Sequence, residues 1–188
     1  MINLSETKND NATTEEFQTN GQLDDKGITI TEQNHIDQLS SRGYGTTENK
    51  TLTLTFYEAL YLHDKGMLTV KNKQNTTVNF QTILHTYQTK DENAWINYIV
   101  YRDLRSRGYV VREGFGTGTE FRVYERGTYG KDPATYMILG TQEGKPLNIT
   151  MLSDVLQQCQ NQKKELVIAV INRRGEIVYY TVSQLTFK

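Results

Sequence analysis

The sequence predicts a mixed α/β (α+β) fold, in which a small N-terminal α/β domain precedes a larger C-terminal domain built on a mixed sheet. Three observations support this class. Short stretches of strand-like alternation follow stretches of helical period along most of the chain. The polar segment 88–94 separates two such groups and marks a domain boundary. The continuous apolar run 166–171 is typical of a strand that is buried on both faces.

Length and composition exclude several classes of protein. The chain has 188 residues, enough for one medium domain or two small ones. Its single cysteine, Cys159, excludes an intrachain disulfide, and nothing in the composition favours secretion. No apolar run approaches the roughly 20 residues of a membrane-spanning helix, and the N-terminus shows no signal-peptide pattern. We therefore expect a cytoplasmic protein with no membrane contact.

Residues 1–26 are expected to form a disordered acidic tail. They are rich in Asn, Thr and acidic residues and show no apolar period. Six acidic residues against two lysines give this segment a charge of −4, which leaves +3 for the remaining residues of a chain whose total is −1. Any contact with nucleic acid must therefore come from a local patch or from a partner.

Residues 27–93 are predicted to form the N-terminal α/β domain. Alternation through Leu52 and Leu54 indicates a strand. Thr55 and Glu58 then have the spacing of a capping box, which predicts a helix start, and Gly66 ends that helix. A short strand, a turn and a second strand that leads into a helix complete this domain.

Residues 94–188 are predicted to form the C-terminal domain. A first helix ends at Gly108, and a second helix covers about 149–159. Between them, Phe121 and Val123 alternate with Arg122 and Tyr124, which indicates a strand with one apolar and one polar face. The buried strand 166–171 is followed by a turn and a last strand. The apolar residues that define the first helix are Trp95, Ile96, Ile99, Val100 and Leu104.

The segment 95–127, "WINYIVYRDLRSRGYVVREGFGTGTEFRVYERG", closely resembles the catalytic core of archaeal tRNA-splicing endonucleases (tRNA-intron lyases). That family shows a helix of the form Y-x-V-Y-x-D-L-R-x-R-G-Y-x-V, then a glycine turn and F-x-V-Y-x-x-G. The end of the chain and the segment around "LTLTFYEALYLHDKGMLTV" are also similar, so the likeness runs over 36–188 in collinear order. It implies an accessory N-terminal domain and a restriction-endonuclease-like C-terminal domain.

The resemblance implies excision of introns from precursor tRNA at bulge-helix-bulge motifs. The family's chemistry is a transesterification that uses no metal and no cofactor, and it leaves 2′,3′-cyclic phosphate and 5′-OH ends. A tyrosine takes the 2′-OH proton, a histidine protonates the leaving oxygen, and a lysine stabilises the charge on the phosphorane. Four equivalent units form the active assembly.

Two of these three catalytic residues have counterparts in this chain. Tyr124 matches the tyrosine, and Lys164 matches the lysine, although the adjacent Lys163 leaves the assignment open by one residue. The histidine position, three residues before Tyr136, holds Pro133. The family's base-clamping arginine is also replaced, by Gln157, which cannot supply a cation–π contact. All three histidines, His35, His63 and His85, lie in the N-terminal domain.

These departures favour a structural, non-cleaving subunit that pairs with a catalytic homologue in a heterotetramer with two copies of each chain. An alternative is a catalytically active endonuclease with a substitute general acid in the loop 128–133. A third interpretation is an RNA-binding module that has lost cleavage, which the near-neutral charge does not favour.

The last strand and the turn before it are expected to mediate contacts between chains. An aromatic strand at a chain end is an exposed edge unless a partner covers it. In the family the turn is acidic and docks on a second dimer. Here it contains Arg173 and Arg174, which are candidates for contacts with RNA phosphates. The expected interface residues are Ile177, Val178, Tyr179, Val182, Leu185 and Phe187.

Overall fold

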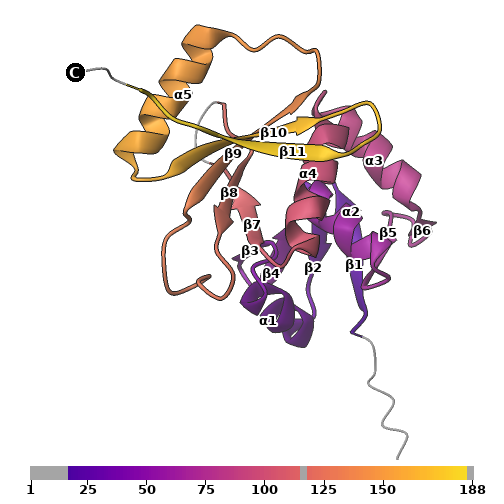
Figure 1. Cartoon of the computed structure of the whole chain (residues 1–188). Helices are drawn as coiled ribbons and strands as arrows, with labels where there is room; N and C mark the ends of the chain where they lie inside the picture. Colours follow the sequence, from indigo (N-terminus) through magenta and orange to yellow (C-terminus); the bar gives the residue numbers. More distant parts are fainter. Residues whose placement is uncertain (1–16, 115–117, 186–188) are drawn as a thin grey trace, which may run out of the picture.

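The computed structural model describes residues 17–114 and 118–185, and it contains two mixed sheets and five helices over these residues (Figure 1). The first half contains β1 (Thr19–Asp24), β2 (Gly27–Ile30), α1 (Gln33–Ser41), β3 (Thr46–Glu48), β4 (Thr51–Leu54), α2 (Phe56–Asp64), β5 (Leu68–Lys71), β6 (Thr77–Val78) and α3 (Phe80–Gln88). The second half contains α4 (Ala94–Ser106), β7 (Val110–Glu113), β8 (Phe121–Tyr124), β9 (Tyr136–Gln142), α5 (Ile149–Asn161), β10 (Glu165–Ile171) and β11 (Ile177–Val182). The mixed α/β class predicted from the sequence is confirmed.

The N-terminal sheet begins earlier in the chain than the sequence predicted. Its strand order is β3-β4-β2-β1-β5-β6, so β1 lies inside the sheet, antiparallel to β2 and parallel to β5. Assigning all of 1–26 to a disordered tail was therefore wrong for residues 19–24, while residues 1–16 lie outside the described part. The strand escaped notice because its two buried positions hold Thr19 and Gly21, which produce no apolar alternation. A Cβ on Gly21 would lie 2.3 Å from Ile28 Cγ2, so this strand needs a small residue there.

The residues that were predicted to begin and end α2 do so in the structure. Thr55 Oγ1 accepts a hydrogen bond from the Glu58 amide, and the Glu58 carboxylate accepts one from the Thr55 amide at 2.9 Å. Both halves of the capping box are therefore present. At the other end, Gly66 follows the last turn with φ of +71°, a conformation that costs a residue with a Cβ.

Gly45 and Gly66 form a matched pair for a prediction about stability. Their φ angles are +64° and +71°, but a Cβ on Gly45 would lie 2.6 Å from Leu52 Cδ1, whereas a Cβ on Gly66 would meet nothing within 4 Å. Gly66→Ala is expected to lower the free energy of unfolding by about 1–2 kcal/mol, the cost of the left-handed backbone. Gly45→Ala is expected to lose a further ~1–3 kcal/mol through overpacking.

Urea-induced unfolding of the two variants beside the unchanged chain measures the difference. Equal losses in the two variants would show that the Leu52 side chain and the Thr53 backbone oxygen adjust without cost, against this account of the β3–β4 region.

The C-terminal sheet has the order β11-β10-β9-β8-β7, in which only β9 and β10 run parallel. One face packs against α4 in a core that also contains the N-terminal strands and α2, so the two halves of the molecule share this core. Figure 1 shows α2 and α4 in the middle of the molecule, between the two sheets. The other face packs against α5 in a second, smaller core. Of the described helices, none is long and apolar enough to cross a membrane.

A buried ion pair joins the two halves. Glu58 on α2 and Arg112 on β7 are 3.4 Å apart, and their side chains are only 2% and 15% exposed. Arg112 also donates to the backbone oxygen of Gly43 at 3.1 Å. Glu58 accepts from the Gly45 amide at 3.0 Å as well as from Thr55. Burial raises the pKa of the Glu58 carboxyl, and Arg112 and these amides partly offset the rise.

Candidate functional site

The register of three strands brings the predicted catalytic positions to one edge of the C-terminal sheet. Val123 is paired with Tyr136, and Tyr136 is paired with Glu165. Tyr124 therefore lies at the end of β8, next to the residue before β9, which in turn lies next to Lys164 before β10. With two strand spacings of about 4.8 Å, the Cα atoms of Tyr124 and Lys164 are roughly 10 Å apart.

The side chains at this edge also share a face. Phe121 and Val123 belong to the core beneath α4, so the alternation of β8 directs Tyr124 to the α5 face. Leu166 and Ile168 of β10 belong to the core beneath α5, which places Lys164 on the same face. The structure thus brings Tyr124 and Lys164 together on one face of one edge, which the sequence alone did not establish.

A second tyrosine lies against Tyr124. The ring of Tyr129 meets the ring of Tyr124 edge to face, with centroids 5.0 Å apart, and both residues are half-buried. The loop that carries Tyr129 is anchored at both ends, because the Thr135 amide donates to the Val123 oxygen at 3.0 Å and the Tyr136 hydroxyl donates to Glu125 at 3.3 Å. Tyr129 is therefore an ordered part of this edge that the sequence analysis did not single out.

The structure separates the two candidate lysines. Lys163 is exposed in a left-handed conformation with φ of +56°, so it belongs to the turn after α5. Lys164 is half-buried, and its amide donates to the Cys159 oxygen at 2.9 Å. Burial raises the pKa of the Cys159 thiol, and the positive charge of Lys164 partly offsets this rise. Lys164 is consequently the lysine that lies at the sheet edge.

Proline stands at the position where the resemblance predicts the general acid. Pro133 is exposed and lies in the loop two residues before Thr135. The three histidines all lie on N-terminal elements: His35 contacts Thr19 and Glu32, and His63 bonds to the Leu68 oxygen. Neither of these two is directed to the edge, and His85 is exposed on α3.

The expected interface residues of the last strand divide between two faces. Ile177 and Tyr179 pack against the core beneath α4, and the Tyr179 hydroxyl bonds to Asp103 at 2.8 Å. These two are therefore intramolecular packing residues as well as interface candidates. Val178 is 47% exposed, Val182 is half-buried, and Leu185 is 75% exposed. Phe187 lies outside the described residues.

Further exposed apolar side chains extend this surface beyond the expected residues. Tyr180 on β11 is 54% exposed, and Ile149 at the start of α5 is 75% exposed. A cavity of about 430 Å³ between α5 and the end of β11 is lined by Ile149, Leu152 and Val182. Gln157, at the position where the resemblance predicts a base-clamping arginine, also lines this cavity. The alternation of β11 alone separates Tyr180 from Tyr179, so that signal was present in the sequence.

The two arginines at the β10–β11 turn are exposed and project from a turn that is fixed from within. Asn172 Oδ1 accepts from the amides of Arg174 and Glu176 at 2.9 and 3.0 Å, and Asn172 Nδ2 donates to the Glu176 carboxylate at 2.7 Å. The Glu176 carboxylate, the acidic group of this turn, is therefore hydrogen-bonded within the turn. Arg173 and Arg174 lie at the far end of β10 from Lys164, so they do not belong to the Tyr124 edge.

Among residues 17–114 and 118–185, no group of three or more His, Cys, Asp or Glu side chains is arranged to hold a metal ion. The polar groups at the Tyr124 edge include two phenols and a lysine ammonium, which suit proton transfer and the binding of an anion.

Comparison with known proteins gives matches in both halves. A family described as "tRNA intron endonuclease, N-terminal domain" matches residues 19–84, and one described as "tRNA intron endonuclease, catalytic C-terminal domain" matches residues 94–179. A tRNA-splicing endonuclease of Methanococcus vannielii is 33% identical over 163 residues, which cover 87% of this chain and 92% of the relative. One of Pyrococcus furiosus is 34% identical over 153 residues, which cover 81% and 88%.

A longer relative matches this chain over less than half of its own length. The tRNA-splicing endonuclease of Methanococcoides burtonii is 30% identical over 165 residues, which cover 87% of this chain but 46% of that protein. The two matched domains, in this order and joined through one core, define an intron-endonuclease architecture. This chain belongs to the tRNA intron endonuclease family.

Proposed function

We propose that this chain is the structural, non-cleaving subunit of a tRNA-splicing endonuclease, which excises introns from precursor tRNA at bulge-helix-bulge motifs in the cytoplasm. The observation that carries this proposal is Pro133, which occupies the acid position beside Tyr124 and Lys164. Proline has no group that can donate a proton. The family match supports the substrate, and the altered edge supports the division of labour.

The reaction of the assembly is a metal-independent transesterification. The ribose 2′-OH attacks the adjacent phosphate, the bond to the 5′-oxygen breaks, and a 2′,3′-cyclic phosphate and a 5′-OH result. This needs a base, an acid and a cation at the phosphorane. In this chain Tyr124 and Lys164 would occupy the positions of the base and the cation without taking part in cleavage, since loss of the acid costs about 10²–10⁴ in rate.

A catalytic homologue would complete the assembly, which we propose to be a heterotetramer with two copies of each chain. The exposed apolar side chains of β11 and α5 support this partner. Val178, Tyr180 and Ile149 are 47%, 54% and 75% exposed on neighbouring elements. β11 is also an edge strand, whose free backbone groups favour pairing with another strand.

A second candidate is an endonuclease that cleaves by itself with a substitute acid, and Tyr129 is the observation that favours it. Its ring lies against Tyr124, and a phenol hydroxyl is a hydrogen-bond and proton donor. Lys131 and Asp132 in the same loop are exposed. Tyr129 is preferred to these two because its ring contacts Tyr124.

The decisive test is cleavage of a bulge-helix-bulge RNA in EDTA by the purified chain, alone and mixed with a homologue that carries the histidine. We expect no cleavage by the chain alone and cleavage by the mixture. Tyr124→Phe in this chain should leave the rate of the mixture unchanged, because only the partner's edge reacts.

Cleavage by the chain alone would refute the structural role. In that case Tyr129→Phe decides whether Tyr129 is the substitute acid, and the pH–rate profile of the unchanged chain should then report a phenol rather than an imidazole.

A further inference from the structure

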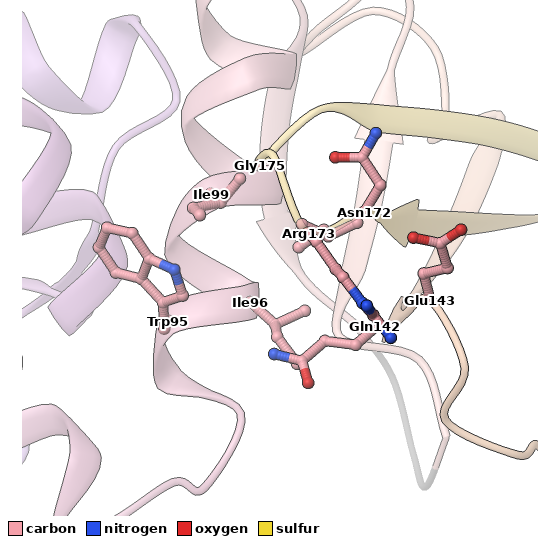
Figure 2. Close-up of a pocket in the computed structure, with 9 residues that line it drawn as sticks. Trp95, Ile96, Ile99, Gln142, Glu143, Asn172, Arg173 and Gly175 are labelled. Atoms are coloured by element: carbon pink, nitrogen blue, oxygen red, sulfur yellow. The ribbon is translucent and has the colours of Figure 1, made fainter.

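A cavity at the opposite end of the C-terminal sheet is unrelated to the Tyr124 edge. It lies between the start of α4, the end of β9 and the β10–β11 turn, and its volume is about 390 Å³ (Figure 2). Counted along β10 from Lys164 to Asn172, it is about 26 Å from the Tyr124 edge. Its lining residues include Trp95, Ile96, Ile99, Gln142, Glu143 and Arg173.

An exposed indole forms one end of this cavity. Trp95 is the only tryptophan of the chain and is 42% exposed, although large aromatic side chains usually lie inside. Its ring is supported from behind by Tyr98, whose centroid is 5.7 Å away and which is itself buried. A supported indole with a free surface is a rigid platform for stacking.

Three polar side chains complete the cavity without using their own hydrogen-bonding groups elsewhere. Gln142, Glu143 and Arg173 are exposed, and within the described parts of the chain their side chains make no hydrogen bond or ion pair. Figure 2 shows Gln142 and Arg173 between Trp95 at one end and Glu143 at the other, with Ile96 beside Gln142. Lys145 adds a second cation close by, where its Nζ lies 3.5 Å from Asn93 Oδ1.

We infer that this cavity binds a single unpaired nucleotide, with the base stacked on Trp95 and the phosphate bound by Arg173. An aromatic ring, a free amide and a guanidinium are the groups that recognise an unstacked base and its phosphate. The Gln142 amide can donate to and accept from a base edge, and the Glu143 carboxylate can accept from a ribose 2′-OH. An apolar ligand would leave these polar groups unpaired, and an acidic peptide would place its carboxylates beside Glu143.

The nucleotide would belong to an RNA held far from the cleaved phosphate. This choice of RNA rests on the proposed function, whereas the chemistry of the cavity does not. Since the cavity lies at the far end of β10, it would hold the body of the precursor tRNA, or a bulge other than the one at the Tyr124 edge. The non-cleaving chain would then contribute binding and positioning.

The test uses the fluorescence of Trp95, which reports stacking directly because no other tryptophan is present. A short single-stranded oligoribonucleotide is titrated into the full chain, with no partner present. We expect saturable quenching of the emission. Arg173→Ala should weaken binding about tenfold through loss of a charged contact, and Trp95→Ala should weaken it by a similar factor when binding is followed by the anisotropy of a labelled oligonucleotide.

Lys73→Ala is the matched control. Lys73 occupies the same place in the β5–β6 turn that Arg173 occupies in the β10–β11 turn, because Asn72 Oδ1 accepts from the amides of Gln74 and Thr76 just as Asn172 does in its turn. The Lys73→Ala substitution removes one positive charge, as Arg173→Ala does, but from the N-terminal domain. It should leave the titration unchanged.

Absence of saturable quenching, or equal weakening by Arg173→Ala and Lys73→Ala, would overturn the inference. Equal quenching by free nucleoside monophosphates and by the oligoribonucleotide would show that the cavity binds a nucleotide but does not select RNA. The titration involves neither cleavage nor a partner. A negative titration therefore leaves the structural-subunit proposal standing. Cleavage by the chain alone would refute the structural-subunit proposal and would say nothing against the cavity.

Discussion

Pro133→His is expected to create cleavage activity in this chain. Tyr124 and Lys164 already share one face of one sheet edge, and residue 133 lies in the loop that leads into the strand between them. An imidazole there would supply the missing general acid, which is worth about 10²–10⁴ in rate. The measurement is cleavage of a bulge-helix-bulge RNA in EDTA by a complex of the variant with a homologue whose own catalytic histidine is replaced by alanine.

Two control variants separate the imidazole from the removal of the proline ring. Pro133→Ala frees the loop backbone in the same way but carries no acid, so it should give no activity. Pro133→His combined with Tyr124→Phe should return cleavage to the background, because the new acid would then lack its base. If Pro133→His stays inactive while the complex still binds RNA, then Tyr124 or Lys164 is out of position and this edge of the sheet cannot support cleavage.

Arg112→Ala is expected to lower the free energy of unfolding by about 3–5 kcal/mol, since it leaves the Glu58 carboxylate buried without its cation. Glu58 is 2% exposed and Arg112 joins it from the other half of the molecule. The loss should appear in urea unfolding as one cooperative transition at a lower midpoint. Arg107→Ala is the matched control, because Arg107 is 53% exposed and pairs with Asp103 one helical turn away, where such a pair is worth at most about 1 kcal/mol and Asp103 keeps its bond to Tyr179.

The pH dependence of that loss follows from the raised pKa of Glu58. A carboxyl whose folded pKa exceeds its unfolded value binds more protons when folded, so its contribution to stability is present at low pH and falls as pH rises through the folded pKa. Without Arg112 the folded pKa rises further. Arg112→Ala should therefore be less harmful at acidic pH than at neutral pH. An equal loss of unfolding free energy at acidic and at neutral pH would mean that Glu58 titrates in the same way with and without Arg112.

Much of the fold could be predicted because its signals are local. The capping box of Thr55 and Glu58, the glycines at 66 and 108 and the apolar run 166–171 act over a few residues, and each bounds or forms the expected element. β1 could not be predicted, because Thr19 and Gly21 are buried by Ile28 and β5 rather than by their own hydrophobicity. Its burial is a property of the assembled sheet.

The candidate site shows the same division. The sequence predicted that proline stands at the acid position and that Tyr124 and Lys164 hold the positions of the base and the cation, because residue identity at a motif position requires no coordinates. It did not show Tyr129 against Tyr124, or which of two lysines faces the edge. It also mixed the two faces of β11, since the exposed Tyr180 was left out while the inward Tyr179 was included.

The sequence by itself therefore determined which chemical groups this protein has and which one it lacks. Only the tertiary structure decided which of them meet: Tyr124 with Lys164 at one end of the sheet, and Trp95 with Gln142 and Arg173 at the other. The physical reason is that strand pairing, register and helix packing join residues that are distant along the chain. Those contacts depend on closing long loops around a common core, whereas capping and alternation depend only on neighbouring residues.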